Sequence, residues 1–372
     1  MKLTPALSVL ALCVAGPALA DCETITFSDV GLTDITATTA VATTILEALG
    51  YQTETLVLSV PVTYTSMANG DIDVFLGNWM PTMEADIAPF REAGTVDTVR
   101  MNLTGAKYTL ATNAAGAALG IASFADIAAH RDALGGHIYG IEPGNDGNRL
   151  ILDMIEADAF GLQGFEVVES SEQGMLAQVQ RSDRRDEPVV FLGWEPHPMN
   201  ANFQMTYLEG GDDYFGPNFG GAEVYTNTRA GYVTECPNVG ALLGNMEFTL
   251  AMENEIMGAI LNDGTAPEEA AIITGRSQAP SSVLPPAGAG NTPPKSDQRT
   301  EARAEQLPPV TGPDPRQPGH NYLSIVTLTW KDAHAAVRFL QKNGVPAMCV
   351  PVGKVDPATA QANNANHLVF VL

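Results

Sequence analysis

The chain has 372 residues, and its formal net charge at pH 7 is −24. A chain of this length is long enough for more than one hydrophobic core. The negative charge would repel the phosphate backbone of nucleic acids, so we expect no nucleic-acid partner. Residues 1–275 hold 10 Lys/Arg against 37 Asp/Glu, and the remaining residues hold 9 against 6. The acidic part therefore suits a cationic or zwitterionic solute better than an anionic one.

Residues 1–20 have the features of a secretory signal peptide. Lys2 provides the positive start, Leu7 to Val14 the apolar centre, and Ala18-Leu19-Ala20 a small-residue cleavage site. The apolar stretch is too short to span a bilayer, and no later segment is long enough either. Since Asp21 disfavours a lipid-anchored form, we expect cleavage after Ala20 and a soluble exported product that does not itself span the membrane.

Export permits disulfide bonds. Cys13 lies in the signal peptide, so Cys22, Cys236 and Cys349 would remain in the exported chain. A bridge between Cys22 and Cys236 would tie the N-terminus to a distant segment. Buried free thiols are the alternative, and the residues alone do not fix a pairing.

From Ile25 onward the pattern alternates between strands and helices. The predicted strands are 25–27, 56–60, 74–76, 137–141, 165–168 and 189–192, and the predicted helices are 36–49, 148–158 and 172–180. Thr33 or Asp34 is the expected N-cap of the first helix, and Gly50 its stop. This order predicts an α/β fold with a largely parallel sheet. The pattern restarts near 108–110, so residues 21–262 should form two α/β halves.

The composition changes after residue 275. Ten prolines lie between Ser277 and His320, which is typical of a disordered or extended linker over 276–320. A small α/β module of unknown role is expected over 321–372, with strands at 322–329, near 348–352 and at 367–372 around a helix at 332–343.

A run of Val-Phe-Leu-Gly followed by Trp and Pro occurs twice. The first copy is 74–81 and the second is 190–196, with Trp79 and Trp194 at the ends of the two predicted strands. Ligands bind at the carboxyl ends of strands in α/β sheets. Packing of a core does not require the same arrangement twice, so the repetition favours two aromatic walls that face one cleft.

No sequence motif supports an enzyme. The chain has no HExxH or CxxC pattern and its six His are scattered, so we expect neither a metal nor a cofactor. It also has no G-x-S-x-G elbow, Walker A loop or G-x-G-x-x-G loop.

The aromatic and acidic residues suggest how a cation could be bound. A quaternary ammonium group has no N–H to donate, so proteins hold it with aromatic faces and carboxylates. Trp79, Trp194 and Tyr108 are the candidate walls, and Asp34 is the candidate carboxylate, although a helix N-cap is the alternative role for Asp34. Asn145, in the polar loop 142–148, could contact a ligand oxygen or could simply serve the turn.

Seven segments carry a family resemblance: FSDVGLTDITATT at 27–39, LSVPVTYTSM at 58–67, DVFLGNWMPTMEADI at 73–87, GAKYTLATN at 105–113, YGIEPGNDGNRL at 139–150, ESSEQGMLAQV at 169–179 and VFLGWEPHPMNANF at 190–203. From about Cys22 to Leu261 the chain resembles the choline-binding periplasmic proteins of ABC importers, within the glycine betaine/choline receptor group. The resemblance implies a two-lobed type II periplasmic binding fold that closes over its ligand. The lobes would be 21–110 with 208–275, and 111–207, with a hinge near 111–113 and 205–210.

The resemblance also implies roles for individual residues. Trp79, Trp194 and Tyr108 would form three walls of an aromatic cage, Asp34 would lie near the cationic head and hydroxyl of choline, and Asn145 would bind the hydroxyl. Cys22 and Cys236 correspond to the paired cysteines of the family. Two departures stand out: Leu32 replaces a Trp that forms the fourth wall, and the match ends near Asp263. His197, between two prolines, is expected to pack beneath Trp194.

The implied function is that of a monomeric periplasmic receptor that delivers choline to an ABC permease without transforming it. Glycine betaine, or another quaternary amine, is the nearest alternative ligand. A hydrolase or lyase that acts on choline esters is the alternative from another class of protein, and it would need a nucleophile beside a base.

Overall fold

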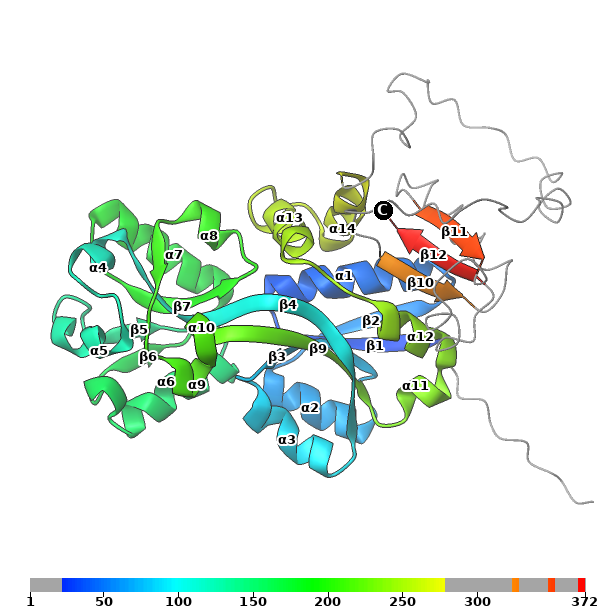
Figure 1. The fold of residues 1–372 in the computed structure, drawn as a ribbon, viewed down its shortest axis with the longest axis horizontal. Coiled ribbons are helices and arrows are strands. Elements are labelled where there is room, and N and C mark those ends of the chain that lie inside the picture. Colours follow the sequence, from blue (N-terminus) through cyan, green and yellow to red (C-terminus); the bar gives the residue numbers. More distant parts are fainter. Residues whose placement is uncertain (1–21, 278–322, 328–346, 352–366, 372) are drawn as a thin grey trace, which may run out of the picture.

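The computed structural model describes residues 22–277 and three short segments at 323–327, 347–351 and 367–371. Figure 1 shows an elongated α/β molecule whose two ends are joined by long, curved strands. In the parts of the chain that the structure describes, no helix is long and apolar enough to cross a membrane. The predicted signal peptide, most of the predicted linker and the predicted helix at 332–343 lie outside the described residues.

Nine strands form one sheet in the order β2-β1-β3-β9-β4-β7-β5-β6, with β8 paired to β4. Their bounds are β1 Thr24–Asp29, β2 Gln52–Val57, β3 Val74–Met80, β4 Val96–Asn113, β5 His137–Tyr139, β6 Glu166–Val168, β7 Val190–Glu195, β8 Met205–Tyr207 and β9 Gly221–Arg229. β1, β2 and β3 are parallel to one another, as are β5, β6 and β7. Every pair that involves β4 or β9 is antiparallel. The sheet is therefore mixed, because two return strands, which the sequence pattern did not reveal, connect the predicted parallel parts.

The helices cover the sheet in two groups. Their bounds are α1 Thr33–Ala48, α2 Val60–Asn69, α3 Glu84–Glu92, α4 Ala114–Ala118, α5 Phe124–Ile127, α6 Asp146–Glu156, α7 Glu172–Arg185, α8 Met199–Asn202, α9 Asp212–Phe215, α10 Pro217–Gly220, α11 Tyr232–Glu235, α12 Pro237–Asn245, α13 Leu250–Leu261 and α14 Pro267–Ser277, with short 3₁₀ turns at Ala128–His130 and Ala159–Gly161. We call the part with β1–β3, α1–α3 and α11–α14 the first lobe, and the part with β5–β8 and α4–α9 the second lobe (Figure 1).

Strand β4 belongs to both lobes. Its first part pairs with β9, and from Lys107 onward it pairs with β7. The predicted crossing at 111–113 lies further along, where β4 pairs with both β7 and β8. The other predicted crossing, at 205–210, also lies on the second lobe, since the Leu208 N–H donates to the Leu110 carbonyl. The chain returns to the first lobe through α10 and β9.

Helix α1 begins earlier than predicted. Thr33 and Asp34, the expected N-caps, lie inside its first turn, and Leu32 occupies the N-cap position with extended backbone and no side-chain capping bond. The side chain of Asp34 is instead engaged with Trp79 on β3. A tertiary contact has thus taken the place of the local cap that is usual for an acidic residue at this position.

The turn before α1 is stabilised by Asp29 at the end of β1. Its carboxylate accepts hydrogen bonds from the Gly31 N–H at 2.7 Å and from the Thr36 hydroxyl at 2.6 Å. Gly31 has φ of 83°, a left-handed conformation that glycine adopts without strain. This local network fixes where Leu32 and the first turn of α1 point.

The strand predicted at 56–60 was placed too far along the chain. β2 ends at Val57, and Val60 is the first residue of α2, with Ser59 at the N-cap and Pro61 in the first turn. Pro is favoured at this end of a helix because its missing N–H would be unpaired there in any case. Helix α6 likewise begins at Asp146 rather than at 148, with Asn145 as its N-cap.

The structure joins Cys22 and Cys236 in a disulfide, with a Cα–Cα distance of 5.8 Å. The bond ties the chain two residues before β1 to the N-cap of α12. Helices α13 and α14 pack on α1 and on each other. Helix α14 continues the first lobe to Ser277, beyond Asp263, where the resemblance was expected to end.

The three C-terminal segments form a separate antiparallel sheet in the order β10-β12-β11, with bounds β10 Leu323–Thr327, β11 Ala347–Pro351 and β12 His367–Val371. β10 and β12 lie within strands predicted from the sequence, and β11 begins one residue before the strand predicted near 348–352. Figure 1 draws β10 beside α12, and the two elements are in contact.

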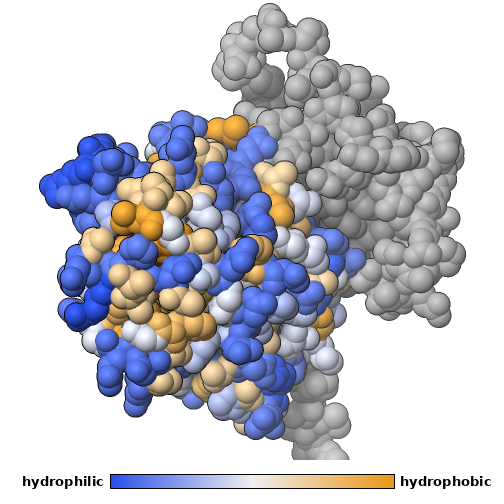
Figure 2. Space-filling model, turned by 60° about the vertical axis from the view of Figure 1, so that its left-hand side comes forward, coloured by the Kyte–Doolittle hydropathy of each residue, from blue (hydrophilic) through white to orange (hydrophobic). Residues whose placement is uncertain are grey.

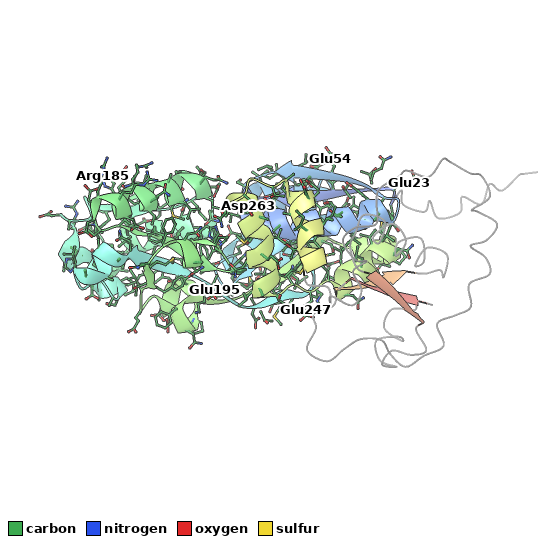
Figure 3. All side chains as sticks on the ribbon, turned by 90° about the horizontal axis from the view of Figure 1, so that it is seen from above. Glu23, Glu54, Arg185, Glu195, Glu247 and Asp263 are labelled. Carbon is green, nitrogen blue, oxygen red and sulfur yellow. A yellow bond between two sulfur atoms is a disulfide. The ribbon has the colours of Figure 1, made fainter. Side chains whose placement is uncertain are left out.

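Charged side chains lie on the surface along the whole molecule, from Arg185 at the far end of the second lobe to Glu54 on the first (Figure 3). On the face turned forward in Figure 2, hydrophilic residues surround separate groups of apolar ones. The large apolar side chains exposed on and beside the second lobe are Leu119, Leu152 and Phe219.

Candidate ligand-binding site

A cavity between the two lobes brings all six predicted site residues together. Its volume is about 10 Å³, and it is lined by Leu32, Asp34, Trp79, Met83, Tyr108, Ile141, Asn145, Asp146 and Trp194. None of these residues is more than 7 % exposed. The first four belong to the first lobe, the last four belong to the second, and Tyr108 lies on the shared strand β4. The cavity is thus closed by both lobes.

Three aromatic rings form adjacent walls of this cavity. The centroids of Trp79 and Tyr108 are 6.0 Å apart with an interplanar angle of 65°, and those of Tyr108 and Trp194 are 6.3 Å apart at 88°. Trp79 lies at the end of β3 and Trp194 at the end of β7, where Trp194 is the register partner of Tyr108. The two copies of the repeated run therefore deliver their indoles to the same cavity, one from each lobe.

Asp34 carries the carboxylate that faces the rings from α1. Its Oδ2 accepts a hydrogen bond from the Trp79 Nε1–H at 3.0 Å, and its Oδ1 has no partner. Burial, together with the nearby carboxylate of Glu172, raises the pKa of Asp34 to about 7, although the hydrogen bond from Trp79 opposes this shift. An opposite charge in the cavity would favour the ionised form.

Tyr108 and Asn145 are linked across the cavity wall. The Tyr108 hydroxyl donates to Asn145 Oδ1 at 2.6 Å, and the same oxygen caps α6 by accepting from the Gly147 N–H at 2.8 Å. A Cβ at position 147 would overlap the Tyr108 hydroxyl, so only glycine permits this close approach. Asn145 can therefore both stabilise the turn and contact a ligand. Its side-chain oxygen accepts hydrogen bonds from Tyr108 and Gly147, and its amide nitrogen is the group that could donate to a ligand.

Beneath Trp194 lies a buried polar network. The His197 ring is 4.7 Å from the Trp194 ring at an angle of 70°. Its Nδ1 accepts from the Met199 N–H, so Nε2 carries the proton and donates to Glu172 Oε1 at 2.6 Å. Glu172 Oε2 accepts from both the N–H and the hydroxyl of Thr33, at 3.1 and 2.5 Å. This carboxylate therefore supports the second indole and also joins the two lobes.

An ion pair between Arg149 and Asp86 also bridges the lobes. The Arg149 Nη2 donates to the Thr82 carbonyl at 3.0 Å and to Asp86 Oδ2 at 2.8 Å. Arg149 is on α6 of the second lobe, whereas Asp86 is on α3 of the first. Both bridges hold the lobes together around the cavity.

Sequence reasoning missed Met83, Ile141, Asp146 and Glu172. Met83 and Ile141 follow β3 and β5, so their positions after strand ends were the available signal. Asp146 was read only as part of a polar turn. Nothing local marked Glu172, because its role depends on Thr33 and His197, which are far from it in the sequence.

An open groove of about 520 Å³ lies elsewhere, where the chain passes between the lobes. It is lined by Met80, Pro81, Gly105, Ala106, Lys107, Pro217, Asn218, Gly221, Ala222 and Glu223. It shares none of the predicted site residues. Among the described residues, no group of His, Cys, Asp and Glu side chains is arranged to hold a metal ion.

Solved structures of high identity share this fold. An ABC-transporter choline binding protein in complex with choline is 73% identical, covers 69% of this chain and 89% of its own, and superposes with a TM-score of 0.68. An ABC-transporter choline binding protein in an unliganded semi-closed conformation is 74% identical, covers 68% of this chain and 88% of its own, and gives a TM-score of 0.64. The predicted two-lobed type II periplasmic binding protein fold is confirmed.

Among curated proteins, an uncharacterised protein, ORF1, from Chromohalobacter salexigens is 48% identical over 130 residues, which is 35% of this chain and 84% of that protein. The family model described as the substrate-binding domain of ABC-type glycine betaine transport systems matches residues 23–272. The match thus extends beyond the 261 expected from sequence and includes most of α14. Members of this family bind solutes outside the cytoplasm, for import by the transporter, and are not enzymes. The chain belongs to the family of substrate-binding domains of ABC-type glycine betaine transport systems.

Proposed function

We propose that this protein binds choline in the cavity between its lobes and delivers it to the permease of an ABC importer. The observation that carries the proposal is the convergence of three aromatic rings and the Asp34 carboxylate on one buried cavity. The 73% identity to a choline binding protein in complex with choline supports the same ligand.

The ring geometry suits a methylated cation. A cation about 4.5 Å from the centroids of two perpendicular rings requires those centroids to be about 6.4 Å apart. The centroids of Tyr108 and Trp194, whose rings are nearly perpendicular at 88°, are 6.3 Å apart, close to this value. Tyr108 would be the middle wall, and the two indoles would flank it.

The unpartnered polar atoms suit a hydroxyl group. Asp34 Oδ1 is an acceptor without a donor, and Trp194 Nε1 is a donor without an acceptor. Buried groups of this kind are costly unless a ligand pairs with them. A hydroxyl both donates and accepts, so the alcohol of choline can pair with groups of either kind.

Glycine betaine fits this cavity less well. Its carboxylate would lie beside that of Asp34, and two like charges at short range are repelled. Hydrolysis of choline esters has weaker support still, since no nucleophile beside a base lines the cavity among the described residues. Acetylcholine incubated with the protein should remain intact.

We further propose that the two lobes, with boundaries that differ from the expected 110/111 and 207/208, close over the ligand by a hinge motion. Because β4 changes partners at Lys107, the crossing segments would be β4 near Lys107 and the stretch 216–221. Glu172 with Thr33 and Arg149 with Asp86 would hold the closed state. Scattering should give a smaller radius of gyration with choline than without it.

We also propose that residues 1–20 direct export, that they are cleaved after Ala20, and that the mature protein works in the periplasm as a monomer. Mass spectrometry of protein recovered from the periplasm would identify the first residue as Asp21 if this is correct. Light scattering would check the monomer.

Titration calorimetry on the mature chain tests the ligand. Choline should bind more tightly than glycine betaine, and Trp194→Leu, which keeps an apolar side chain but removes the π face, should weaken choline binding about tenfold. A Tyr225→Leu variant is the control, since Tyr225 does not line the cavity. Tighter binding of betaine, or no binding of any quaternary amine, would overturn the proposal.

A further inference from the structure

The stretch 216–221, where the chain returns to the first lobe, has an unusual backbone. Asn218 has φ of 58° and ψ of 52°, and Phe219 has φ of 63° and ψ of 47°, so both adopt the left-handed conformation. In the part of the chain that the structure describes, they are the only two successive non-glycine residues with positive φ. Asn adopts this conformation fairly readily, but a bulky residue such as Phe is strained in it.

Burial does not explain why the strain at Phe219 is tolerated, because this side chain is 39 % exposed. The contacts of the neighbouring residues explain it better. Just before the turn, the Phe215 ring lies 5.9 Å from the ring of Phe124, in the second lobe, and 6.0 Å from that of Tyr108, on the shared strand β4. One end of the turn is thus anchored to the second lobe.

The rest of the turn fits closely against the first lobe and β4. A Cβ added to Gly216 would lie 3.0 Å from the ring of Pro81, which follows β3, and a Cβ on Gly220 would overlap the Tyr108 carbonyl oxygen. The Gly220 N–H donates to the Gly216 carbonyl at 3.2 Å and closes the turn. Groups from both lobes therefore hold the left-handed conformation while the lobes are together.

The open groove gives the turn space in which to move. Pro217 and Asn218 line it together with Met80 and Pro81 of the first lobe, and its volume is about 520 Å³. Figure 1 shows α10, which contains the turn, beside the long strands that pass between the lobes. A change in the angle between the lobes would move the turn relative to Pro81 and would remove the close fit that fixes its dihedral angles.

We propose that the turn 216–221 is a strained hinge element, which opposes closure of the lobes and promotes release of the ligand. The inference rests on the proposed function, because it assigns the strain to the closed state of the receptor. In this structure the lobes are closed around a buried cavity and are joined by Glu172 with Thr33 and by Arg149 with Asp86. Separation of the lobes lets Phe219 return to negative φ, so the strain is lost on opening. The ligand and the contacts between the lobes stabilise the closed state against this strain.

The test compares glycine with alanine at position 219. Both substitutions remove the ring, but only glycine removes the strain, and Phe219 does not line the cavity. In titration calorimetry on the mature chain, Phe219→Gly should bind choline about tenfold more tightly than Phe219→Ala. Stopped-flow measurements should show slower release from Phe219→Gly. Without ligand, X-ray scattering should give a smaller radius of gyration for Phe219→Gly than for Phe219→Ala.

Asp186 provides the matched control. It is exposed at the C-cap of α7, has φ of 55°, and lies within the second lobe rather than at a crossing between lobes. Asp186→Gly should melt at a higher temperature than Asp186→Ala, since alanine is strained at this φ. The two variants should bind choline equally, because this strain is the same in the open and the closed states.

Equal choline affinities of Phe219→Gly and Phe219→Ala, or weaker binding by Phe219→Gly, would overturn the inference and leave the choline proposal intact. A merely structural turn would change the melting temperature without changing the affinity or the radius of gyration. If the wild type does not bind choline, the proposed function fails, and the scattering comparison without ligand still decides the role of the turn. If the Phe219 variants do not fold, Asn218→Gly and Asn218→Ala are the second pair, with the same expected order.

Discussion

The two copies of the repeated run hold their indole rings in place by different contacts. Trp79, in β3, and Trp194, in β7, each lie at a strand end and each precede a cis-proline, at Pro81 and Pro196. Yet the Trp79 Nε1–H is bonded to Asp34, whereas the Trp194 Nε1–H has no partner and its ring rests on His197. The first indole is held by a hydrogen bond to a charged group, and the second by packing.

This difference suggests a division of roles between the lobes. In the first lobe the Trp79 indole is hydrogen-bonded to the Asp34 carboxylate, so a change in either residue should affect the contact of the other with the ligand. In the second lobe the indole is supported from behind by His197 and Glu172, which also reaches Thr33 on the first lobe. The second wall should therefore respond to lobe closure. The following experiments test this comparison.

The largest effect is expected from Asp34→Asn. The amide can still accept from the Trp79 indole but carries no charge, so the cation loses its nearest counter-charge in a dry cavity. We expect the affinity for choline to fall about a hundredfold and the affinity for betaine to fall much less. Calorimetry with both ligands measures this. An equal loss for both would show that the carboxylate does not discriminate between them.

The two indoles should not be equivalent. Trp79→Leu removes a ring and also leaves Asp34 without its donor, so it should weaken choline binding about thirtyfold, against about tenfold for Trp194→Leu. Fluorescence or calorimetric titration of the two variants gives the ratio. Equal losses would contradict the asymmetry between the two lobes.

A smaller gain is expected from Leu32→Trp. Leu32 lines the cavity from the N-cap of α1 and offers no π face. A fourth aromatic wall should strengthen choline binding several-fold, up to about tenfold. Leu32→Met is the matched control, because it changes shape without adding a ring. If Leu32→Trp binds more weakly than Leu32→Met, the site has no room for the added ring.

The smallest effect concerns the ligand-free protein. The pKa values of Asp34 and Asp146, about 7 and about 6, lie above the value of about 3.8 expected in the unfolded chain. Between these values the folded state binds more protons than the unfolded one, so the free energy of unfolding falls as the pH rises from about 4 to 7. The melting temperature should be a few degrees higher at pH 5 than at pH 8. Asp34→Asn should reduce this difference, and a difference unchanged in that variant would contradict the assignment.

Much of the fold was predictable because its periodicity is local. The parallel strands of both lobes and the helices α1, α6 and α7 follow from apolar spacing and from Gly and Pro stops. Strand β9 and most of β4 were missed, since their burial depends on partners in both lobes. Helix α2 was read in part as a strand, because a short apolar run does not reveal its period.

For the site, the sequence was informative where chemistry and position coincide. Trp79, Tyr108 and Trp194 were expected at strand ends, and they line one cavity. Asp146 and Glu172 were missed, because a carboxylate on a helix start has an ordinary local role. Only their burial and their partners distinguish them from surface acids.

By itself, the sequence determined the α/β class and the family. It also identified Trp79, Trp194 and Asp34 as candidate site residues, since these conclusions follow from local pattern and residue type. The tertiary structure decided which groups are left unpaired. Hydrogen bonding and burial are properties of neighbours brought together by the sheet, so the sequence could not show that Asp34 binds Trp79 or that both oxygens of Asp146 are free. These unpaired groups line a buried cavity, and under the proposed function they would give the site its preference for a cation.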